Sequence, residues 1–256
     1  MNSITKTQFN YLKPYIKNNL SGIEIINGVP KVVYICWFGH TKGFTPEFTV
    51  RRFNAIVSLI ECIKVPVILL TWDNYKSFEI PSFPINCGFE YLSGNHKSDY
   101  LRAYMLYHYG GAYHDIKYRK LSWESEWDKF LDPNIWMIGR RELNQDCIGF
   151  SPGEEWVQKE YQKLITMGWV ICRPKTEYIQ ILLQNITKKL EERGDLLKNN
   201  PAIHSRQVQQ VYIDKDNYSY PFGYLELMGE MSHRLQLNYT NHINYTLPDI
   251  LYKTYK

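Results

Sequence analysis

Two short apolar runs in the first third of the chain are typical of buried parallel strands. Residues 31–39 are rich in β-branched and aromatic side chains and end at a glycine, and residues 65–73 are likewise rich in β-branched and other apolar side chains. Between them, apolar residues recur at helical spacing over residues 53–63, with Thr45 as the expected cap and Pro46 in the first turn. A strand, a helix and a second strand in this order predict a crossover between parallel strands.

A second helical segment ends abruptly at a pair of glycines. Residues 97–109 have a helical pattern with Asn95 or Ser98 as the expected cap, and the glycines at 110–111 follow. The first glycine suits the left-handed conformation that commonly ends a helix. Residues 112–115 then predict a short strand, so we expect a tight reversal between helix and strand.

The rest of the chain continues to alternate between predicted strands and helices. We expect strands at residues 135–140, 147–150 and 168–174, and helices at residues 154–165, 176–193 and about 205–212. The sequence has no internal repeat and no convincing linker. The prediction is therefore one α/β domain over residues 1–256, built on a parallel-dominated sheet.

The composition supports a folded domain and argues against a nucleic-acid partner. Hydrophobic residues make up 44% of the 256 residues and charged residues 22%, which is enough apolar material for a sizeable core. The net charge of +4 is mild, and the lysines are spread along the chain. This charge suits a small anionic ligand, and we expect no nucleic acid as a partner.

The cysteines and the apolar runs predict a cytoplasmic chain with no transmembrane segment. Five cysteines lie far apart without C-x-x-C spacing, which favours free thiols in a reducing compartment over a zinc site. The N-terminal stretch lacks the apolar core of a secretion signal, and no run approaches the roughly 18 apolar residues of a spanning helix. If the chain is viral, the expected compartment is the host cytoplasm.

Three charged side chains around the glycine pair are predicted to converge. Asp99 and Arg102 are three residues apart on the predicted helix and therefore share a face. The reversal brings Asp115 back beside that helix, and ligands of open α/β sheets bind at the carboxyl ends of strands. The alternative for Asp99 and Arg102 is a surface ion pair worth under ~1 kcal/mol. Two carboxylates and an arginine together favour a polyhydroxyl, anionic ligand.

The same segment resembles the DXD region of glycosyltransferase family 32 and of the related capsular polysaccharide synthesis proteins. The family pattern is roughly S-D-x-x-R, then L-x-x-x-G-G-x-Y, then D-x-D. The corresponding residues here are Ser98, Asp99, Arg102, Leu106, Gly110, Gly111, Tyr113, Asp115 and Lys117. Residues 29–39 also resemble the first strand and the tryptophan-bearing nucleotide loop of the family. The likeness thus covers about residues 29–120.

This resemblance implies a GT-A fold, which is a Rossmann-like, parallel-dominated mixed sheet flanked by helices. Such a fold binds a nucleotide-diphosphate sugar as donor, normally together with Mn²⁺. Residues 29–120 would form the half that binds the nucleotide sugar, and residues 121–256 would form the acceptor side. Leu106 and Tyr113 would serve for packing.

The resemblance also assigns roles to individual residues. Trp37 and Phe38 would bind the nucleotide; the alternative for Trp37 is an ordinary core tryptophan at a strand end. Asp99 and Arg102 would contact the transferred sugar. Asp115 would face the ribose, the diphosphate and a metal ion, and it is the residue expected to ligate that metal.

Lys117 stands where the family pattern has its second aspartate, usually the direct metal ligand. An ammonium group cannot ligate Mn²⁺ or Mg²⁺, because both ions require oxygen donors. In one interpretation, Lys117 neutralises the leaving diphosphate, assisted by Arg119, Lys120 or a residue from elsewhere. In a second, Mn²⁺ or Mg²⁺ still binds through Asp115 and one C-terminal group. Candidates for that group are His233, His242 and Asp249.

The predicted reaction is transfer of a glycosyl group from a nucleotide-diphosphate sugar to a glycan or other hydroxyl acceptor, in polysaccharide or surface-glycan synthesis. The resemblance implies retention of the anomeric configuration, with Arg102, Asp115 and Lys117 as the catalytic residues. If the reaction inverts instead, a carboxylate must lie near the acceptor. Candidates for that base are Glu142, Asp146 and Glu154. The alternative function is a catalytically inactive protein that binds a nucleotide sugar.

Overall fold

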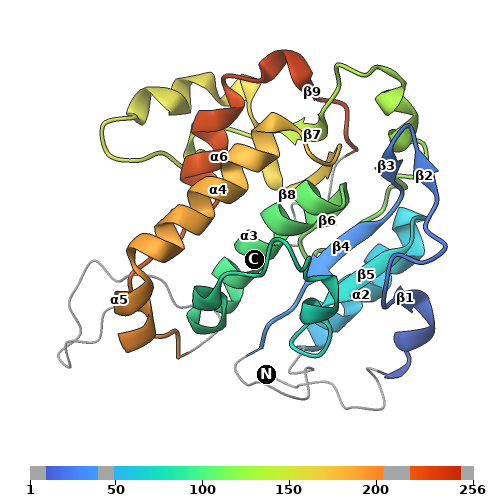
Figure 1. The fold of residues 1–256 in the computed structure, drawn as a ribbon. Helices are drawn as coiled ribbons and strands as arrows, with labels where there is room; N and C mark the ends of the chain where they lie inside the picture. Colours follow the sequence, from blue (N-terminus) through green and yellow to red (C-terminus); the bar gives the residue numbers. More distant parts are fainter. Residues whose placement is uncertain (1–9, 40–48, 204–219, 249–256) are drawn as a thin grey trace.

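The structure is a computed structural model that describes residues 10–39, 49–203 and 220–248. Within these residues, one seven-stranded sheet has the strand order β1-β5-β4-β6-β8-β7-β9 (Figure 1). Its strands are β1 (Ile16–Lys17), β4 (Val33–Cys36), β5 (Val67–Leu70), β6 (Gly111–His114), β7 (Met137–Arg141), β8 (Ile165–Cys172) and β9 (Ile243–Asn244). A separate antiparallel pair is formed by β2 (Ile25–Ile26) and β3 (Val29–Pro30).

The sheet is mixed but mostly parallel. Strands β1, β5, β4 and β6 run parallel to one another, and β9 runs parallel to β7. Strand β8 is antiparallel to both of its neighbours, β6 and β7. The predicted α/β fold with a parallel-dominated mixed sheet is therefore confirmed, and the arrangement is consistent with GT-A.

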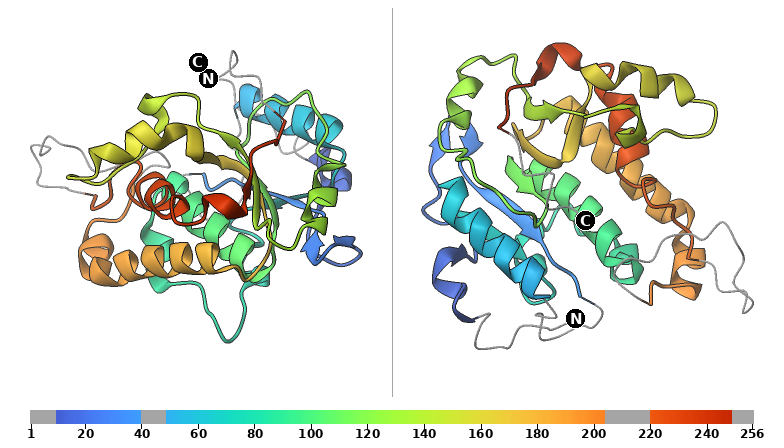
Figure 2. Two further views of the ribbon diagram at one scale, coloured as in Figure 1. Left: turned by 90° about the horizontal axis from the view of Figure 1, so that it is seen from above. Right: turned by 180° about the vertical axis from the view of Figure 1, so that it is seen from behind.

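Helices cover both faces of the sheet. They are α2 (Val50–Ile63), α3 (Gly94–His108), α4 (Glu177–Glu192), α5 (Gly194–Asn199) and α6 (Gly229–Gln236). Helix α2 lies on one side of the sheet, and α3, α4 and α6 lie on the other (Figures 1 and 2). Successive side chains of a strand point to opposite faces. In β4, Val33 and Ile35 accordingly belong to the core under α2, and Tyr34 and Cys36 belong to the core under α3 and α4.

The predicted strand–helix–strand unit near the start of the chain is confirmed. Strands β4 and β5 are parallel neighbours, and α2 lies between them in the sequence. Helix α2 begins at Val50, and the Thr49 side chain caps it by accepting a hydrogen bond from the Arg52 amide. The expected cap Thr45 and first-turn Pro46 lie outside the described residues.

The strand predicted at residues 147–150 is wrong. Residues Gln145–Cys147 form a 3₁₀ turn, and residues 148–150 after it do not pair with any strand of the described sheet. The apolar side chains that suggested a strand are buried by packing instead, because Ile148 forms a small cluster with Val157 and Leu164. Gly149 in the same stretch lies so close to the Gly229 backbone that a Cβ atom would approach it to 2.7 Å.

The helix predicted at residues 154–165 forms as a 3₁₀ helix, Glu155–Lys163, that leads into β8. Val157 is its one buried residue, so little packing favours an α-helix here. The helices predicted at 97–109 and 176–193 are confirmed as α3 and α4. The helix predicted at about 205–212 falls outside the described residues.

The glycine pair produces the expected reversal between α3 and β6. Gly110 and Gly111 have φ angles of 73° and 91°, in the region that favours glycine. Space requires glycine as well, because a Cβ atom on Gly110 would lie 2.5 Å from the Pro174 ring and one on Gly111 would lie 2.9 Å from Val32. None of the described helices is long and apolar enough to cross a bilayer.

Candidate functional site

Helix α3 and strand β6 place the predicted charged residues at one end of the sheet. Helix α3 is capped by the Ser93 hydroxyl, which accepts a hydrogen bond from the His96 amide, so the expected caps Asn95 and Ser98 lie inside the helix. Asp99 and Arg102 follow in the next turn, where both side chains are buried. Asp115 directly follows β6, the central strand of the sheet.

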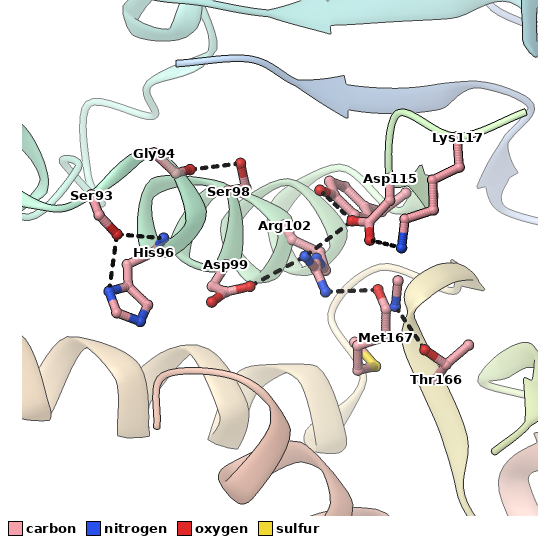
Figure 3. A network of polar contacts seen from close by, with 12 residues as sticks. Ser93, Gly94, His96, Ser98, Asp99, Arg102, Asp115, Lys117, Thr166 and Met167 are labelled. Atoms are coloured by element: carbon pink, nitrogen blue, oxygen red, sulfur yellow. Dashed lines mark hydrogen bonds and ion pairs between the residues drawn. The ribbon is translucent and has the colours of Figure 1, made fainter. Parts of the chain in front are cut away.

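Arg102 is the centre of the site (Figure 3). One terminal nitrogen, Nη2, lies 3.2 Å from Asp99 Oδ1 and 3.6 Å from Asp115 Oδ1. The other, Nη1, donates a hydrogen bond of 2.8 Å to the Met167 carbonyl. The guanidinium carbon also lies 4.1 Å from the centre of the Tyr113 ring. The predicted convergence of Asp99, Arg102 and Asp115 is therefore present, with Arg102 between the two carboxylates.

Asp115 has a polar neighbour at each carboxylate oxygen. Its Oδ1 accepts a hydrogen bond of 3.1 Å from the Tyr113 hydroxyl, and its Oδ2 lies 3.0 Å from the Lys117 ammonium (Figure 3). The backbone N–H of Asp115 donates to the Gly168 carbonyl at 2.7 Å. Because a Cβ atom on Gly168 would lie 3.3 Å from Oδ2, β8 approaches the carboxylate closely at this point.

The two carboxyl groups have opposite pKa shifts. Burial would raise the pKa of Asp115, but the Lys117 ammonium and the Arg102 guanidinium outweigh burial and lower it to about 2. Burial dominates at Asp99 and raises its pKa to about 7, although Arg102 acts in the other direction. Asp115 is thus a fixed negative charge at neutral pH, whereas Asp99 exchanges its proton near neutrality.

Lys117 is held against the site instead of extending into solvent. Its side chain is 13% exposed, and its ammonium lies 5.5 Å from the centre of the Trp169 ring. Burial lowers the pKa of this ammonium, as do Arg52 and Arg102, while Asp115 opposes the change. The surroundings of Asp115 therefore do not fit a divalent cation, since such an ion would lie beside two fixed positive groups.

Two of the predicted C-terminal metal ligands, His233 and His242, lie elsewhere. Among the described residues, no group of three or more His, Cys, Asp or Glu side chains is arranged to hold a metal ion. The His233 ring contacts Glu142 at 3.2 Å and accepts from the Gly149 amide at 3.0 Å. The His242 ring stacks on Trp136 with 3.9 Å between centroids. Asp249 lies outside the described residues.

The carboxylates considered as an inverting base do not join this network. Glu142 is buried against His233. Glu154 forms an ion pair of 3.3 Å with Arg234, and Asp146 is exposed in the 3₁₀ turn before Ile148.

Arg119 does not assist Lys117, contrary to one sequence-based interpretation. Its buried guanidinium donates to the Leu121 carbonyl at 2.7 Å and to the His114 ring at 3.1 Å. It also lies 4.1 Å from the centre of the Trp123 ring. Side chains of a strand alternate between its two faces, but this alternation does not extend to Arg119, because β6 ends at His114. Lys120 is exposed.

The two aromatic residues predicted to bind the nucleotide have different surroundings. Trp37 follows β4 and is half-buried, with its backbone N–H donating to the Leu70 carbonyl. Phe38 is 3% exposed and packs edge-on against Trp72 and Phe89, with ring centroids 5.4 and 5.6 Å apart. Phe38 is therefore a core residue, which leaves Trp37 as the candidate for stacking on a base.

Sequence reasoning overlooked four residues that contribute to the site. Tyr113 was expected only to pack, yet its hydroxyl donates to Asp115. Met167 and Gly168 belong to a strand remote in sequence, and they contribute backbone carbonyls to Arg102 and Asp115. Arg52 in the first turn of α2 donates a hydrogen bond of 2.6 Å to the Ile116 carbonyl, between Asp115 and Lys117. Of these four residues, Tyr113 alone had a sequence signal, because it occupies a position of the family pattern.

Comparison with known proteins agrees with this geometry. Residues 56–120 match the family model described as the glycosyltransferase sugar-binding region containing DXD motif. The match spans α3, β6 and the residues from Asp99 to Lys117 that build the site. No curated protein and no solved structure matched the chain. This part of the chain is therefore similar to the sugar-binding region of glycosyltransferases that contain a DXD motif, and it lies in an α/β fold consistent with GT-A.

Proposed function

We propose that this protein transfers a sugar from a nucleotide-diphosphate sugar to a hydroxyl group of a glycan or another acceptor. The observation that carries the proposal is Arg102, which lies between the Asp99 and Asp115 carboxylates at the end of the central strand. Such a group offers oxygen acceptors and N–H donors at short range, which suits the hydroxyls of a sugar.

Each charged residue receives a role in this proposal. Asp99 and Arg102 bind hydroxyl groups of the transferred sugar and fix its orientation. Asp115 faces the ribose and the diphosphate, and Trp37 stacks on the base. Lys117 stabilises the charge that develops on the departing diphosphate. The opposite pKa shifts of Asp99 and Asp115 support a division between a hydroxyl-binding carboxyl group and a permanently charged one.

The proposed reaction proceeds with retention. The bond between the anomeric carbon and the β-phosphate oxygen breaks, and its electron pair stays on the phosphate. The acceptor oxygen forms the new bond to the same face of the anomeric carbon, and its proton passes to the departing phosphate. The products are the glycosylated acceptor and a nucleoside diphosphate, and no side chain of the protein has to act as a base.

The proposed setting is polysaccharide or surface-glycan synthesis, with residues 29–120 on the donor side and residues 121–256 on the acceptor side of one domain. Met167 and Gly168 contact Arg102 and Asp115, so the reacting sugar would lie where the two halves meet. The cytoplasmic location stays a prediction from the sequence.

A second candidate function is binding of a nucleotide sugar without turnover. Lys117 favours it, because this residue replaces the acid that ligates the metal in the family pattern. A thermal-shift panel of UDP-, GDP- and dTDP-linked sugars, with and without Mn²⁺, identifies the donor for either function. Release of nucleoside diphosphate from that donor then separates the two. Binding with release supports transfer or its hydrolytic side reaction, binding without release with every acceptor supports the second candidate, and no binding contradicts both.

A further inference from the structure

We propose that Lys117 and Arg52 form a cationic clamp that binds the donor diphosphate in the place where related enzymes use a divalent metal ion. The proposal rests on the function proposed above, because it concerns the diphosphate of the same donor. It adds Arg52 to the donor site and predicts that donor binding needs no metal.

The first half of the clamp is Lys117. Its ammonium lies 3.0 Å from Asp115 Oδ2, so a positive charge of the chain itself already lies beside the carboxylate that was expected to ligate a metal ion. The side chain is 13% exposed and is held over the Trp169 ring. An ammonium has three N–H donors on a flexible side chain, and these suit phosphate oxygens as acceptors.

The second half is Arg52, which reaches this place from a different element. Its Nη1 donates to the Ile116 carbonyl at 2.6 Å, on the segment that joins Asp115 to Lys117. Ile116 directly precedes Lys117 in the chain, so this hydrogen bond holds the guanidinium beside the segment that carries the ammonium. A guanidinium has five N–H donors in a planar fork, and that shape matches two oxygens of a phosphate group. The half-buried position of Arg52 keeps this fork near the end of β6.

The charges around the site match a diphosphate better than they match a cation. Arg52, Arg102 and Lys117 contribute three positive charges, and Asp115 contributes one negative charge. Asp99 is partly neutral near pH 7, because burial raises its pKa to about 7. The group therefore has an excess of one to two positive charges before any donor binds. A diphosphate diester brings about two negative charges, which neutralise that excess, whereas a divalent cation would raise it to about three to four positive charges.

Calorimetry on the wild-type chain tests the clamp without any substitution. The probes are the nucleoside diphosphate and the nucleoside monophosphate of the base selected by the thermal-shift panel, each titrated in EDTA and in Mn²⁺. The clamp predicts that the diphosphate binds at least about tenfold more tightly than the monophosphate in EDTA, as expected for charge-assisted hydrogen bonds to the β-phosphate. Mn²⁺ is expected to change this ratio less than about threefold.

Substitutions then assign the effect to the two residues. Lys117→Gln and Arg52→Gln should each lower diphosphate affinity about tenfold and leave monophosphate affinity within about threefold. The matched controls are Lys120→Gln and Arg51→Gln, which remove exposed cations next to the clamp and should change neither affinity. A purely structural role of Lys117 or Arg52 would weaken both nucleotides together, so the ratio separates the two explanations.

A third variant, Lys117→Asp, restores the acid of the family pattern. It should lose diphosphate binding in EDTA and regain it in Mn²⁺, because two carboxylates can then share the ion. Diphosphate binding by the wild type that is lost in EDTA and restored by Mn²⁺ would overturn the clamp and leave the proposed function standing. If the diphosphate binds without metal and Arg52→Gln leaves its affinity unchanged, Arg52 is not part of the clamp. Failure of every nucleotide to bind, with or without Mn²⁺, would overturn the proposed function and the clamp with it.

Discussion

The ammonium of Lys117 lies 3.0 Å from the carboxylate of Asp115, two positions earlier in the chain. In the family pattern, two aspartates stand at these positions and attract a cation. Here the same spacing produces an internal ion pair, so the positive charge is part of the chain. The end of the central strand is therefore suited to an anion before any ion or donor arrives.

Replacing Arg102 by lysine should remove the guanidinium group that links the Asp99 and Asp115 carboxylates. A lysine keeps the charge but cannot contact Asp99, Asp115 and the Met167 carbonyl together, because it lacks the planar fork. We expect Arg102→Lys to lower the rate of nucleoside diphosphate release about 100-fold. Arg141→Lys, at an exposed arginine, is the control and should keep the wild-type rate. Full activity of Arg102→Lys would contradict the central role of this guanidinium.

The raised pKa of Asp99 predicts a pH-dependent loss of stability. The carboxyl group loses its proton near pH 4 in the unfolded chain but near pH 7 in the folded protein. Between these values the folded state binds more protons than the unfolded chain does. The free energy of unfolding of the protein therefore falls as the pH rises from about 4 to about 7 and stays level above that. Asp99→Asn lacks this group and should gain stability relative to the wild type over the same interval, by up to a few kcal/mol.

Melting temperatures of both proteins measured from pH 4 to pH 8 check this prediction. Asp128→Asn, at an exposed acid, controls for the loss of one carboxyl group and should follow the wild type. Parallel curves for Asp99→Asn and the wild type would show that Asp99 titrates in its ordinary range.

Gly168 should be required for the close approach of β8 to the Asp115 carboxylate. A Cβ atom at this position would lie 3.3 Å from Asp115 Oδ2 and 3.4 Å from the Thr166 hydroxyl, which is tighter than ordinary contact. We expect Gly168→Ala to displace the Asp115 carboxylate by a few tenths of an ångström and to lower activity about tenfold. The control is Gly194→Ala, where a Cβ atom meets nothing within 4 Å. Unchanged activity of Gly168→Ala would mean that the carboxylate position is not critical.

Gly110 should be required for the fold through both its backbone and its surroundings. Its φ angle of 73° is strained for alanine, at a cost of about 1–2 kcal/mol, and the new Cβ atom would also overlap Pro174. Gly153 has a similar φ angle of 86° but open space around it. Urea unfolding should therefore show that Gly110→Ala lowers the free energy of unfolding more than Gly153→Ala does, by about 1–3 kcal/mol. Equal losses would show that contact with Pro174 is unimportant.

The sequence predicted the parts of the site that depend on local spacing. Asp99 and Arg102 share a helix face because they are three residues apart, and the glycine pair returns the chain so that Asp115 lies beside them. These relationships need no knowledge of distant contacts. The parallel β4–β5 unit was predictable for the same reason, since its strands and helix follow one another in the chain.

The parts that escaped prediction depend on distant pairing or on which way a side chain turns. Strand β8 contributes its Met167 and Gly168 carbonyls through antiparallel pairing with β6, and no local pattern encodes that register. Phe38 and Trp37 are both aromatic residues at a strand end, yet Phe38 turns into the core. Arg119 turns to His114 and Trp123, because the strand ends before its alternation reaches that residue.

The most direct test of the central claim is the rate at which Asp115→Asn releases nucleoside diphosphate from the donor identified by the thermal-shift panel. The substitution keeps the size of the side chain and removes its charge. The account predicts a fall of at least about 100-fold, with circular dichroism unchanged and Asp128→Asn at the wild-type rate. Release at the wild-type rate by Asp115→Asn would show that the donor reacts somewhere other than the end of the central strand.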